Sequence, residues 1–342
     1  MRATRALFTG MGLLGLGAGS ALIAFVMSSA ACSPSSSSGG PSADQACTDS
    51  AHATCTKMQT CEPTNLQAVY GDEPTCETRL KTSCLNALSA PSTGATPSLS
   101  ESCAQAYANY ACADYRDKTN IPMPCQQASG SLAAGGACEF AAQCQTGFCA
   151  IAPGSACGKC ATTPKQGDSC AQLTSCGATL TCASDTLVCT TVAAQGQSCG
   201  SGQPCGASLS CVAPGGAGTA GTCQAAGTQV GATCDGTAKT GPNCDAVLAL
   251  YCDGKTKQCA QTSYEATGTA CGYNVDAGTL VECLAGSCVT GACAARSADN
   301  GACTVSEGGA ASPTAGCLPP ARCVAMSGAT GTCQVVTGGA CP

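Results

Sequence analysis

Cysteine is the residue type in this chain with the widest possible chemistry. The 342 residues include 35 cysteines and one histidine, His52. Cysteine thiols can join as disulfides, exchange those disulfides, or bind a metal as thiolates. The only C-x2-C motif, Cys157 to Cys160, has the spacing of a thiol–disulfide redox pair. It lacks the strand–turn–helix setting that presents a reactive thiol at a helix start, so we expect a structural role for both cysteines.

Metal and acid–base chemistry have little support in the sequence. A zinc site needs four thiolate or imidazole ligands, and thiols in an oxidising compartment are not available for it. Nothing marks a nucleophile and a carboxylate that would complete a triad with His52. Asp72, Glu73 and Glu77 cluster where a helix is expected to begin, and there they would complement the helix dipole. Acidic residues nearer the C-terminus, such as Asp235, lack the alternate-position spacing of a calcium loop. We expect no catalytic residue, no metal and no cofactor.

The composition excludes several classes of protein. Lys and Arg total 14 against 20 Asp and Glu, a formal net charge of −6, so no basic excess favours nucleic acid as a partner. Only 10% of the residues are charged and 3% are aromatic. With so few aromatic residues, the chain has too little apolar bulk for the core of an ordinary enzyme of this length. The cysteine content is instead that of a disulfide scaffold.

Residues 1–31 have the pattern of a secretory signal peptide. A positive start with two arginines precedes an almost uncharged apolar stretch over 6–27, and small residues then lead to Cys32. Small residues before a cysteine also resemble a bacterial lipobox, in which Cys32 would be lipidated and become the first residue. Residues 32–41 would then form a flexible Ser/Gly tether. The sequence therefore predicts an exported chain held at a membrane through a lipid on Cys32.

The odd number of cysteines bears on this anchor. A lipid on Cys32 would leave 34 cysteines, enough for 17 disulfides. Two other fates of the N-terminus stay open. Ordinary cleavage near Ala30 would release a soluble secreted protein, and retention of the apolar stretch, which is long enough to span a bilayer, would leave a single anchor. A free or intermolecular cysteine would also explain the odd count.

Residues 42–125 show helical periodicity. We expect helices over 43–60, over 74–88 and from about 98 to 115, with capping-box spacings before the first and the third. This part should form a small helical disulfide domain of about three helices. Its eight cysteines are Cys47, Cys55, Cys61, Cys76, Cys84, Cys103, Cys112 and Cys125. The sequence does not choose among their possible pairings.

After a Ser/Ala/Gly linker at 126–136, the chain becomes repetitive. A glycine two or three residues before a cysteine recurs along 137–342, which we divide into six cysteine-rich repeats and a terminal partial repeat. From Cys138 onward, 28 larger apolar residues stand beside 26 cysteines. Ordering the backbone costs about 1–2 kcal/mol per residue, so disulfides worth about 2–4 kcal/mol each must carry this fold. The expected fold class is small and disulfide-rich, with the helical domain followed by an irregular, short-stranded repeat array.

We expect a staggered disulfide scheme in the repeats. Modules two to six have four cysteines, module one has five and the tail has one, so internal closure of every module would strand two cysteines far apart. If the first cysteine of a module pairs with the third and the last pairs with the second of the next module, none is stranded. The expected pairs include Cys170–Cys182, Cys160–Cys176, Cys189–Cys205 and Cys333–Cys341. The candidate disulfide cysteines are Cys138, Cys144, Cys149, Cys157, Cys160, Cys170, Cys176, Cys182, Cys189, Cys333 and Cys341. This scheme predicts a covalently stapled rod. The competing hypothesis is that Cys341 links two chains.

The start of the first repeat carries a family resemblance. Gly135 to Cys149 follows the pattern G-x-x-C-x5-C-x2-G-x-C, which resembles the Dickkopf-like cysteine-rich repeat. Together with the helical eight-cysteine region, most of the mature chain resembles cysteine-rich exported lipoproteins of myxobacteria-like bacteria. The resemblance implies an exported, disulfide-built protein without known catalytic residues, and it does not imply Wnt-pathway activity. Later repeats depart from the pattern, with nine residues between Cys234 and Cys244 and thirteen between Cys303 and Cys317.

These observations favour a non-catalytic function. We expect a surface-anchored lipoprotein, at the outer membrane or cell surface, with a structural, adhesive or protein-binding role. Its partners would be the membrane, through the N-terminal lipid, and a protein or surface polymer, with no nucleic acid. The first alternative is a secreted disulfide-rich inhibitor or effector, since rigid loops suit preorganised binding. The second is a thiol–disulfide redox protein built on Cys157 and Cys160.

Overall fold

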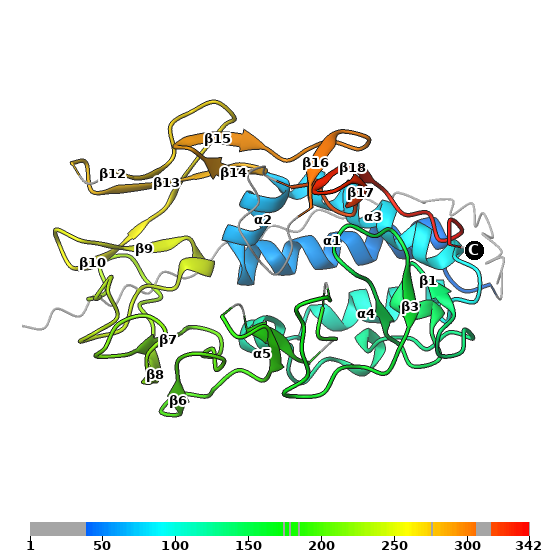
Figure 1. Cartoon of the computed structure of the whole chain (residues 1–342), viewed down its shortest axis with the longest axis horizontal. Helices are drawn as coiled ribbons and strands as arrows, with labels where there is room; N and C mark the ends of the chain where they lie inside the picture. Colours follow the sequence, from blue (N-terminus) through cyan, green and yellow to red (C-terminus); the bar gives the residue numbers. More distant parts are fainter. Residues whose placement is uncertain are drawn as a thin grey trace, which may run out of the picture. The chain divides into compact units, whose positions relative to one another are not determined.

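The computed structural model describes residues 39–173, 175–177, 179–183, 185–274, 276–305 and 316–341. The predicted signal peptide at 1–31, the predicted lipidation site Cys32 and the predicted tether up to residue 38 therefore lie outside the described residues. Among the helices of the described ranges, none is long and apolar enough to cross a membrane. The described residues have the expected fold class, with helices near the N-terminus and then many short strands in small sheets (Figure 1).

Five α-helices and a 3-10 turn make up the helical part. They are α1 (Ala43–Cys61), α2 (Pro63–Tyr70), α3 (Glu73–Ser89), α4 (Pro97–Tyr107), α5 (Cys112–Asp117) and η1 (Met123–Cys125). Four disulfides close this part on itself, namely Cys47–Cys84, Cys55–Cys76, Cys61–Cys112 and Cys103–Cys125. The first two join α1 to α3. Apolar packing is concentrated around Leu66 and Tyr70 of α2, which lie against the Cys55–Cys76 bridge.

The helix ends follow local capping chemistry. The Ser42 side chain accepts a hydrogen bond from the Gln45 N–H at 3.1 Å, at the start predicted for the first helix. The third helix instead begins after Thr96, whose hydroxyl accepts the Leu99 N–H at 3.2 Å. The capping box expected at Ser98 is therefore replaced by a single cap at Thr96, because Pro97 fits the first helical position and fixes where the helix begins.

Two features of the helical part differ from the expectation. The segment expected to be one helix up to residue 115 is divided into α4 and α5 by a break at residues 108–111. A further helix, α2, was not predicted. Its eight residues give too few turns for a clear periodic pattern, and Pro63 at its first position separates it from α1.

The repeats consist of short strands. These are β1 (Ala137–Cys138), β2 (Cys149–Ala150), β3 (Gly158–Cys160), β4 (Thr181–Ala183), β5 (Val188–Thr190), β6 (Ser198–Cys199), β7 (Leu209–Val212), β8 (Gly221–Ala225), β9 (Leu250–Asp253), β10 (Gln258–Gln261), β11 (Ser263–Glu265), β12 (Gly272–Asn274), β13 (Thr279–Cys283), β14 (Gly286–Val289), β15 (Ala292–Ala295), β16 (Ala302–Thr304), β17 (Arg322–Ser327) and β18 (Thr330–Gln334). Two short 3-10 turns, η2 (Ala141–Gln143) and η3 (Ala246–Leu248), lie among them. The strands pair into sheets of two or three strands, such as β1-β3-β2 and β6-β8-β7.

Each module repeats one disulfide arrangement. The first cysteine pairs with the third, as expected, in Cys138–Cys149, Cys170–Cys182, Cys199–Cys211, Cys234–Cys252, Cys271–Cys288 and Cys303–Cys323. The second pairs with the last cysteine of the same module in Cys144–Cys160, Cys176–Cys189, Cys205–Cys223, Cys244–Cys259, Cys283–Cys293 and Cys317–Cys333. The staggered scheme is therefore wrong, including its pairs Cys160–Cys176, Cys189–Cys205 and Cys333–Cys341.

The hairpins explain why the modules close internally. In module two, Cys182 and Cys189 stand opposite each other in β4 and β5. The same register places the third and last cysteines opposite each other in the other five modules. The two hairpin cysteines are thus neighbours, and each pairs with a cysteine of the segment that precedes the hairpin. A disulfide needs Cα atoms about 4.4–6.8 Å apart. That segment lies close enough, since the Cα atoms of Cys176 and Cys189 are 5.6 Å apart.

Consecutive modules are joined through the backbone instead of through disulfides. In four modules, a residue that precedes the module forms a parallel β-bridge with the module's second cysteine. The pairs are Leu132↔Cys144, Ala193↔Cys205, Gly227↔Cys244 and Ser297↔Cys317. The expected linker at 126–136 takes part in this pattern, because the Gly130 N–H donates to the Cys144 carbonyl at 2.9 Å. A Cβ on Gly130 would lie 2.3 Å from the Gln143 and Ser92 carbonyl oxygens, so the close approach requires glycine.

The two cysteines left over by internal closure are bonded to each other. Cys157 of module one pairs with Cys341 across 184 residues of sequence. We call this bond the closing disulfide. The prediction that these cysteines would be stranded far apart is wrong, because the end of the array lies beside its start. A link between two chains through Cys341 is likewise contradicted, and the stapled rod is replaced by a covalently closed loop of modules.

Candidate functional site

The C-terminal end is held by a buried carboxylate as well as by the closing disulfide. Glu139, which is 1% exposed, accepts the backbone N–H groups of Gly338 and, at 2.6 Å, of Ala340. Arg322 donates to the carbonyl oxygens of Ala156 at 2.9 Å and Glu139 at 2.8 Å. Burial lowers the pKa of Arg322 below its usual range. Module one and module six are thus joined by a charge-assisted network around one covalent bond.

A second buried charge pair docks the repeats on the helices. Arg116 of α5 makes a bidentate ion pair with Asp245 of module four, at 2.8 Å to each carboxylate oxygen. Their side chains are 10% and 4% exposed. Arg116 also donates to the Ser208 hydroxyl at 3.0 Å. A buried pair of this kind is strongly sensitive to removal of one partner, so α5 is tightly held to modules three and four.

Further contacts tie α2 and α3 to modules four to six. Arg79 of α3 pairs with Asp299 at 2.6 and 2.7 Å and lowers the pKa of that carboxyl by its hydrogen bonds. The Thr64 hydroxyl of α2 donates to the Ala246 carbonyl at 2.7 Å. These contacts position the repeats against the helices and involve no reactive group.

The C-x2-C motif is divided between two disulfides. Cys157 forms the closing disulfide, and Cys160 pairs with Cys144. The two sulfurs therefore do not form the reversible bond of a redox pair, and both cysteines have structural partners.

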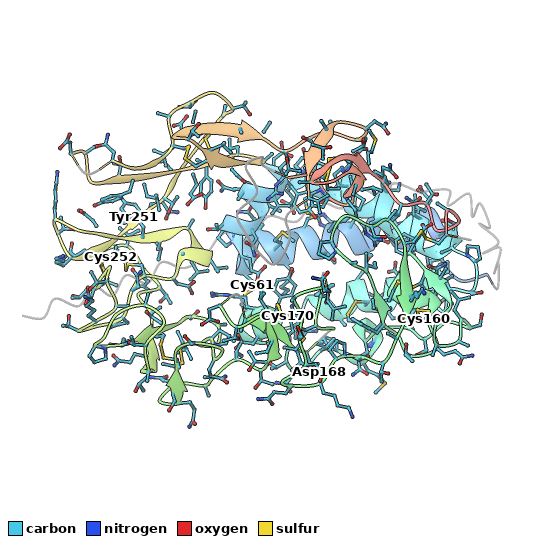
Figure 2. All side chains as sticks on the ribbon, viewed as in Figure 1. Cys61, Cys160, Asp168, Cys170, Tyr251 and Cys252 are labelled. Carbon is cyan, nitrogen blue, oxygen red and sulfur yellow. A yellow bond between two sulfur atoms is a disulfide. The ribbon has the colours of Figure 1, made fainter. Side chains whose placement is uncertain are left out.

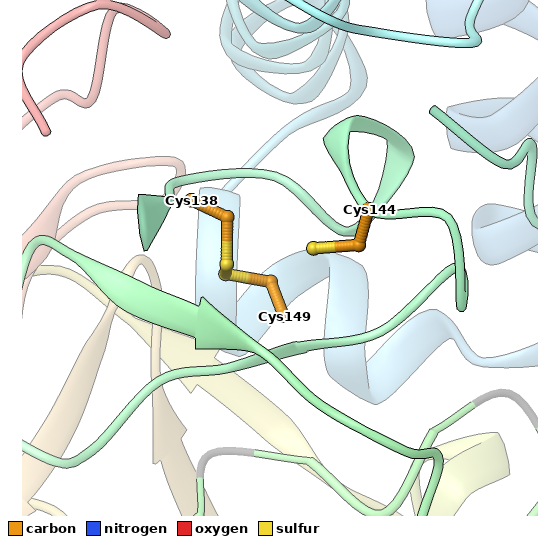
Figure 3. Close-up of side chains that lie close together, drawn as sticks. All are labelled: Cys138, Cys144 and Cys149. Atoms are coloured by element: carbon orange, nitrogen blue, oxygen red, sulfur yellow. A yellow bond between two sulfur atoms is a disulfide. The ribbon is translucent and has the colours of Figure 1, made fainter. Parts of the chain in front are cut away.

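The dense cysteine clusters are packed disulfides. Figure 3 shows the Cys138–Cys149 bond with the Cys144 sulfur beside it. These three sulfur atoms lie within 4.8 Å of one another, a spacing also found in other modules. A zinc site needs thiolates, whereas each of these sulfurs is already bonded to another sulfur. The clusters are therefore the cores of the modules.

The other polar candidates from the sequence have local roles. His52, on α1, lies 2.5 Å from Glu77 of α3, whose hydrogen bond raises the pKa of the imidazole. Asp72 caps α3 by accepting the Thr75 N–H at 2.8 Å, and this bonding lowers its pKa. Asp235 accepts backbone and side-chain hydrogen bonds within its own turn, which lower the pKa of its carboxyl. None of these contacts gathers the residues into one site.

A cavity between modules four and five was not predicted from the sequence. It has a volume of about 510 Å³, within the range typical of small-molecule sites. The hairpin β9–β10 forms one wall, and the three-stranded sheet β11-β13-β12 forms the other. We call it the tyrosine cavity, after Tyr251, Tyr264 and Tyr273, which line it. Tyr251 and Cys252 of its β9 wall are labelled in Figure 2.

Strand register places the lining residues of module five on one face. Tyr264 of β11 stands opposite Glu282 of β13, and Tyr273 of β12 stands opposite Leu280 of β13. Residues two apart on a strand point to the same face, so Leu280 and Glu282 bring both tyrosines to the same side of the sheet. This face meets Tyr251, whose ring centroid lies 6.1 Å from that of Tyr273 at an interplanar angle of 68°.

The tyrosine hydroxyls hold the walls in place. Tyr251 donates to the Gly278 carbonyl at 2.7 Å, which joins β9 to the turn before β13. The Tyr264 hydroxyl donates to the Thr64 hydroxyl of α2 at 2.9 Å, and the Tyr273 hydroxyl accepts the Gly254 N–H at 3.2 Å. Because the hydroxyls are engaged, the rings present their apolar surfaces to the space between them.

Four polar groups at the tyrosine cavity are without a side-chain partner among the described residues. They are the Glu282 carboxylate, the Lys257 ammonium, the Asn243 amide nitrogen and the Thr262 hydroxyl. Such groups in an apolar setting can bind a ligand. The only sequence signal for this site was the grouping of three of the seven tyrosines between positions 251 and 273.

Comparisons with known proteins give no match. No protein-family model matches the chain, and no similar curated protein or solved structure was found. The class of protein therefore rests on its own structure. Seventeen disulfides are typical of the oxidising environment outside the cell or in an export compartment, so this is an extracellular or exported disulfide-rich protein.

Proposed function

We propose that this chain is a lipid-anchored, exported binding protein without catalytic activity. One observation carries the proposal: all 34 cysteines from Cys47 to Cys341 are used in 17 disulfides, and Cys32 is the single cysteine left over. Because all of the remaining cysteines are paired with one another, Cys32 is available for lipid. The resemblance to cysteine-rich exported lipoproteins supports the same proposal, with the outer membrane or cell surface as the location.

The structure also favours binding over chemistry. The buried charged groups Arg116, Asp245 and Glu139 are engaged in contacts that hold parts of the chain together. The tyrosine cavity is framed by the disulfides Cys234–Cys252 and Cys244–Cys259 of module four. A site held in this way loses little conformational entropy when a ligand binds. The redox alternative loses its support, because Cys157 and Cys160 belong to separate disulfides.

The test is to compare the full chain with a Cys32→Ser variant in a host that exports lipoproteins. We expect the wild-type chain to partition into the detergent phase and to show an intact mass that begins at a lipid-modified Cys32. Alkylation without reduction should add no label. The Cys32→Ser chain should lose the lipid mass and leave the detergent phase, while a Ser33→Ala control should behave as wild type. An unlipidated wild-type mass, or alkylation at two sites, would overturn the proposal.

A further inference from the structure

The charge balance of the tyrosine cavity limits what it can hold. One free carboxylate, on Glu282, and one free ammonium, on Lys257, line the same space. An anionic ligand would meet the carboxylate, and a cationic ligand would meet the ammonium, so each carries a repulsive contact with one of the two charges. A ligand without net charge can use both groups as hydrogen-bond partners.

The polar groups of the tyrosine cavity favour a ligand that carries both hydrogen-bond donors and hydrogen-bond acceptors. Glu282 can only accept hydrogen bonds, Lys257 and the Asn243 amide nitrogen can only donate, and the Thr262 hydroxyl can do either. Thr262 is 7% exposed, so a purely apolar occupant would cut such groups off from water without replacing their hydrogen bonds. Hydroxyl groups satisfy both kinds of partner.

The aromatic rings of the cavity walls favour a ligand that also has an apolar face. The rings of Tyr251 and Tyr273 are arranged edge to face, and Tyr273 is 43% exposed, so part of its ring is open to a ligand. The electron-rich face of an aromatic ring attracts C–H groups that carry partial positive charge. A sugar ring combines such a C–H face with a rim of hydroxyls.

We propose that the tyrosine cavity binds an uncharged saccharide unit, with its C–H face on Tyr273 and its hydroxyls on Glu282, Lys257 and Asn243. This inference rests on the proposed function as a surface-anchored binding protein and specifies its partner as a surface polysaccharide. Thr64 and Tyr264 also line the cavity and are joined by a hydrogen bond. The cavity is preformed because module disulfides and cross-module hydrogen bonds fix both walls.

The experiment uses the full-length chain with its native disulfides. Saturation-transfer NMR and tyrosine fluorescence would be measured with glucose, galactose, mannose, N-acetylglucosamine and cellobiose as probes. The chain has no tryptophan, so fluorescence reports on the tyrosines directly. We expect saturable binding of at least one probe. Tyr273→Ala and Glu282→Gln should each raise Kd by about tenfold or more, since an aromatic contact or a charge-assisted hydrogen bond is lost.

Glu265→Gln provides the matched control. Glu265 lies next to Tyr264 on β11, on the opposite face of the strand, and it is exposed. This change should leave Kd unaltered. Alkylation of each variant without reduction checks that the disulfides have formed.

Three results would overturn the inference. The first is an absence of saturable binding of any probe by the correctly disulfide-bonded chain. The second is binding that survives both Tyr273→Ala and Glu282→Gln. The third is a preference for glycine or glycyl-tyrosine, tested in parallel, because these zwitterions would use the two charges without a sugar ring. If the same preparation is lipidated at Cys32, these failures remove the ligand class and leave the proposed function standing.

Discussion

Removal of the closing disulfide tests the architecture most directly. The perturbation is the double change Cys157→Ser and Cys341→Ser, which deletes the one covalent link between the two ends of the array. The buried Glu139 network remains in this variant, so the folded state keeps its tail contacts. The main effect should therefore fall on the unfolded chain, which gains conformational freedom.

The expected magnitude follows from the length of the loop. The two cysteines are 184 residues apart in sequence, but the module disulfides cut across this path and shorten it to roughly 100 residues in the unfolded chain. Chain entropy for such a loop gives about 4.7 kcal/mol. The Cys271–Cys288 bond spans 17 residues, which gives about 3 kcal/mol by the same relation. The closing disulfide should therefore contribute about 1.5 kcal/mol more.

The assay is equilibrium unfolding of the oxidised protein in urea, followed by circular dichroism. The matched control is Cys271→Ser with Cys288→Ser, because neither of those cysteines nor either end of the closing disulfide is fully buried. We expect the closing-disulfide variant to have the lower unfolding free energy of the two. The single change Cys157→Ser should in addition leave Cys341 as the one residue that an alkylating reagent labels.

Two outcomes would refute this reasoning. If the closing-disulfide variant is as stable as the Cys271–Cys288 variant, or more stable, the closed loop does not act through chain entropy. If Cys157→Ser leaves Cys341 protected from alkylation, Cys341 has another partner and the pairing itself is wrong.

Three further predictions address charged contacts within the fold. Arg116→Met should lower the free energy of unfolding by about 3–5 kcal/mol, because it strands the buried Asp245 carboxylate; the double variant with Asp245→Asn should recover part of this loss in urea titrations. Glu139→Gln should cost about 1–3 kcal/mol, since its buried charge serves the terminal N–H groups, and faster proteolysis of the C-terminal tail would report it. The pKa of His52 is raised in the fold by Glu77, so this pair stabilises the protein below pH 6.5 and the gain is lost as pH rises through the raised pKa. The urea midpoint of wild type should fall over that range relative to His52→Ala, and an identical pH profile for the two proteins would contradict the assignment.

Local features were predictable from the sequence because their causes are local. The helix start at Ser42 follows from a side chain that bonds an N–H three residues away. The pairing of the first cysteine with the third stays inside one module, and Cys170 and Cys182 are only 12 residues apart. The limits of this reasoning appear at α2, whose eight residues leave little periodicity to detect.

The tyrosine cavity could not be predicted, because no local pattern describes it. Tyr264 and Tyr273 come together only through the register of β11, β13 and β12. Tyr251 belongs to another module and reaches them through a hydrogen bond to Gly278. The cavity therefore depends on packing between two modules, whereas the spacing of the cysteines reports only on the interior of each module.

The sequence by itself determined the fold class, the division into helical and repetitive parts, and the even number of cysteines that remains once Cys32 is set aside. These properties depend on composition and short-range spacing. Only the tertiary structure decided which cysteines meet, because a disulfide forms between side chains that are neighbours in space. The hairpins bring each module's cysteines together, and docking on the helices by residues such as Arg79 and Arg116 leads the array back so that Cys341 meets Cys157.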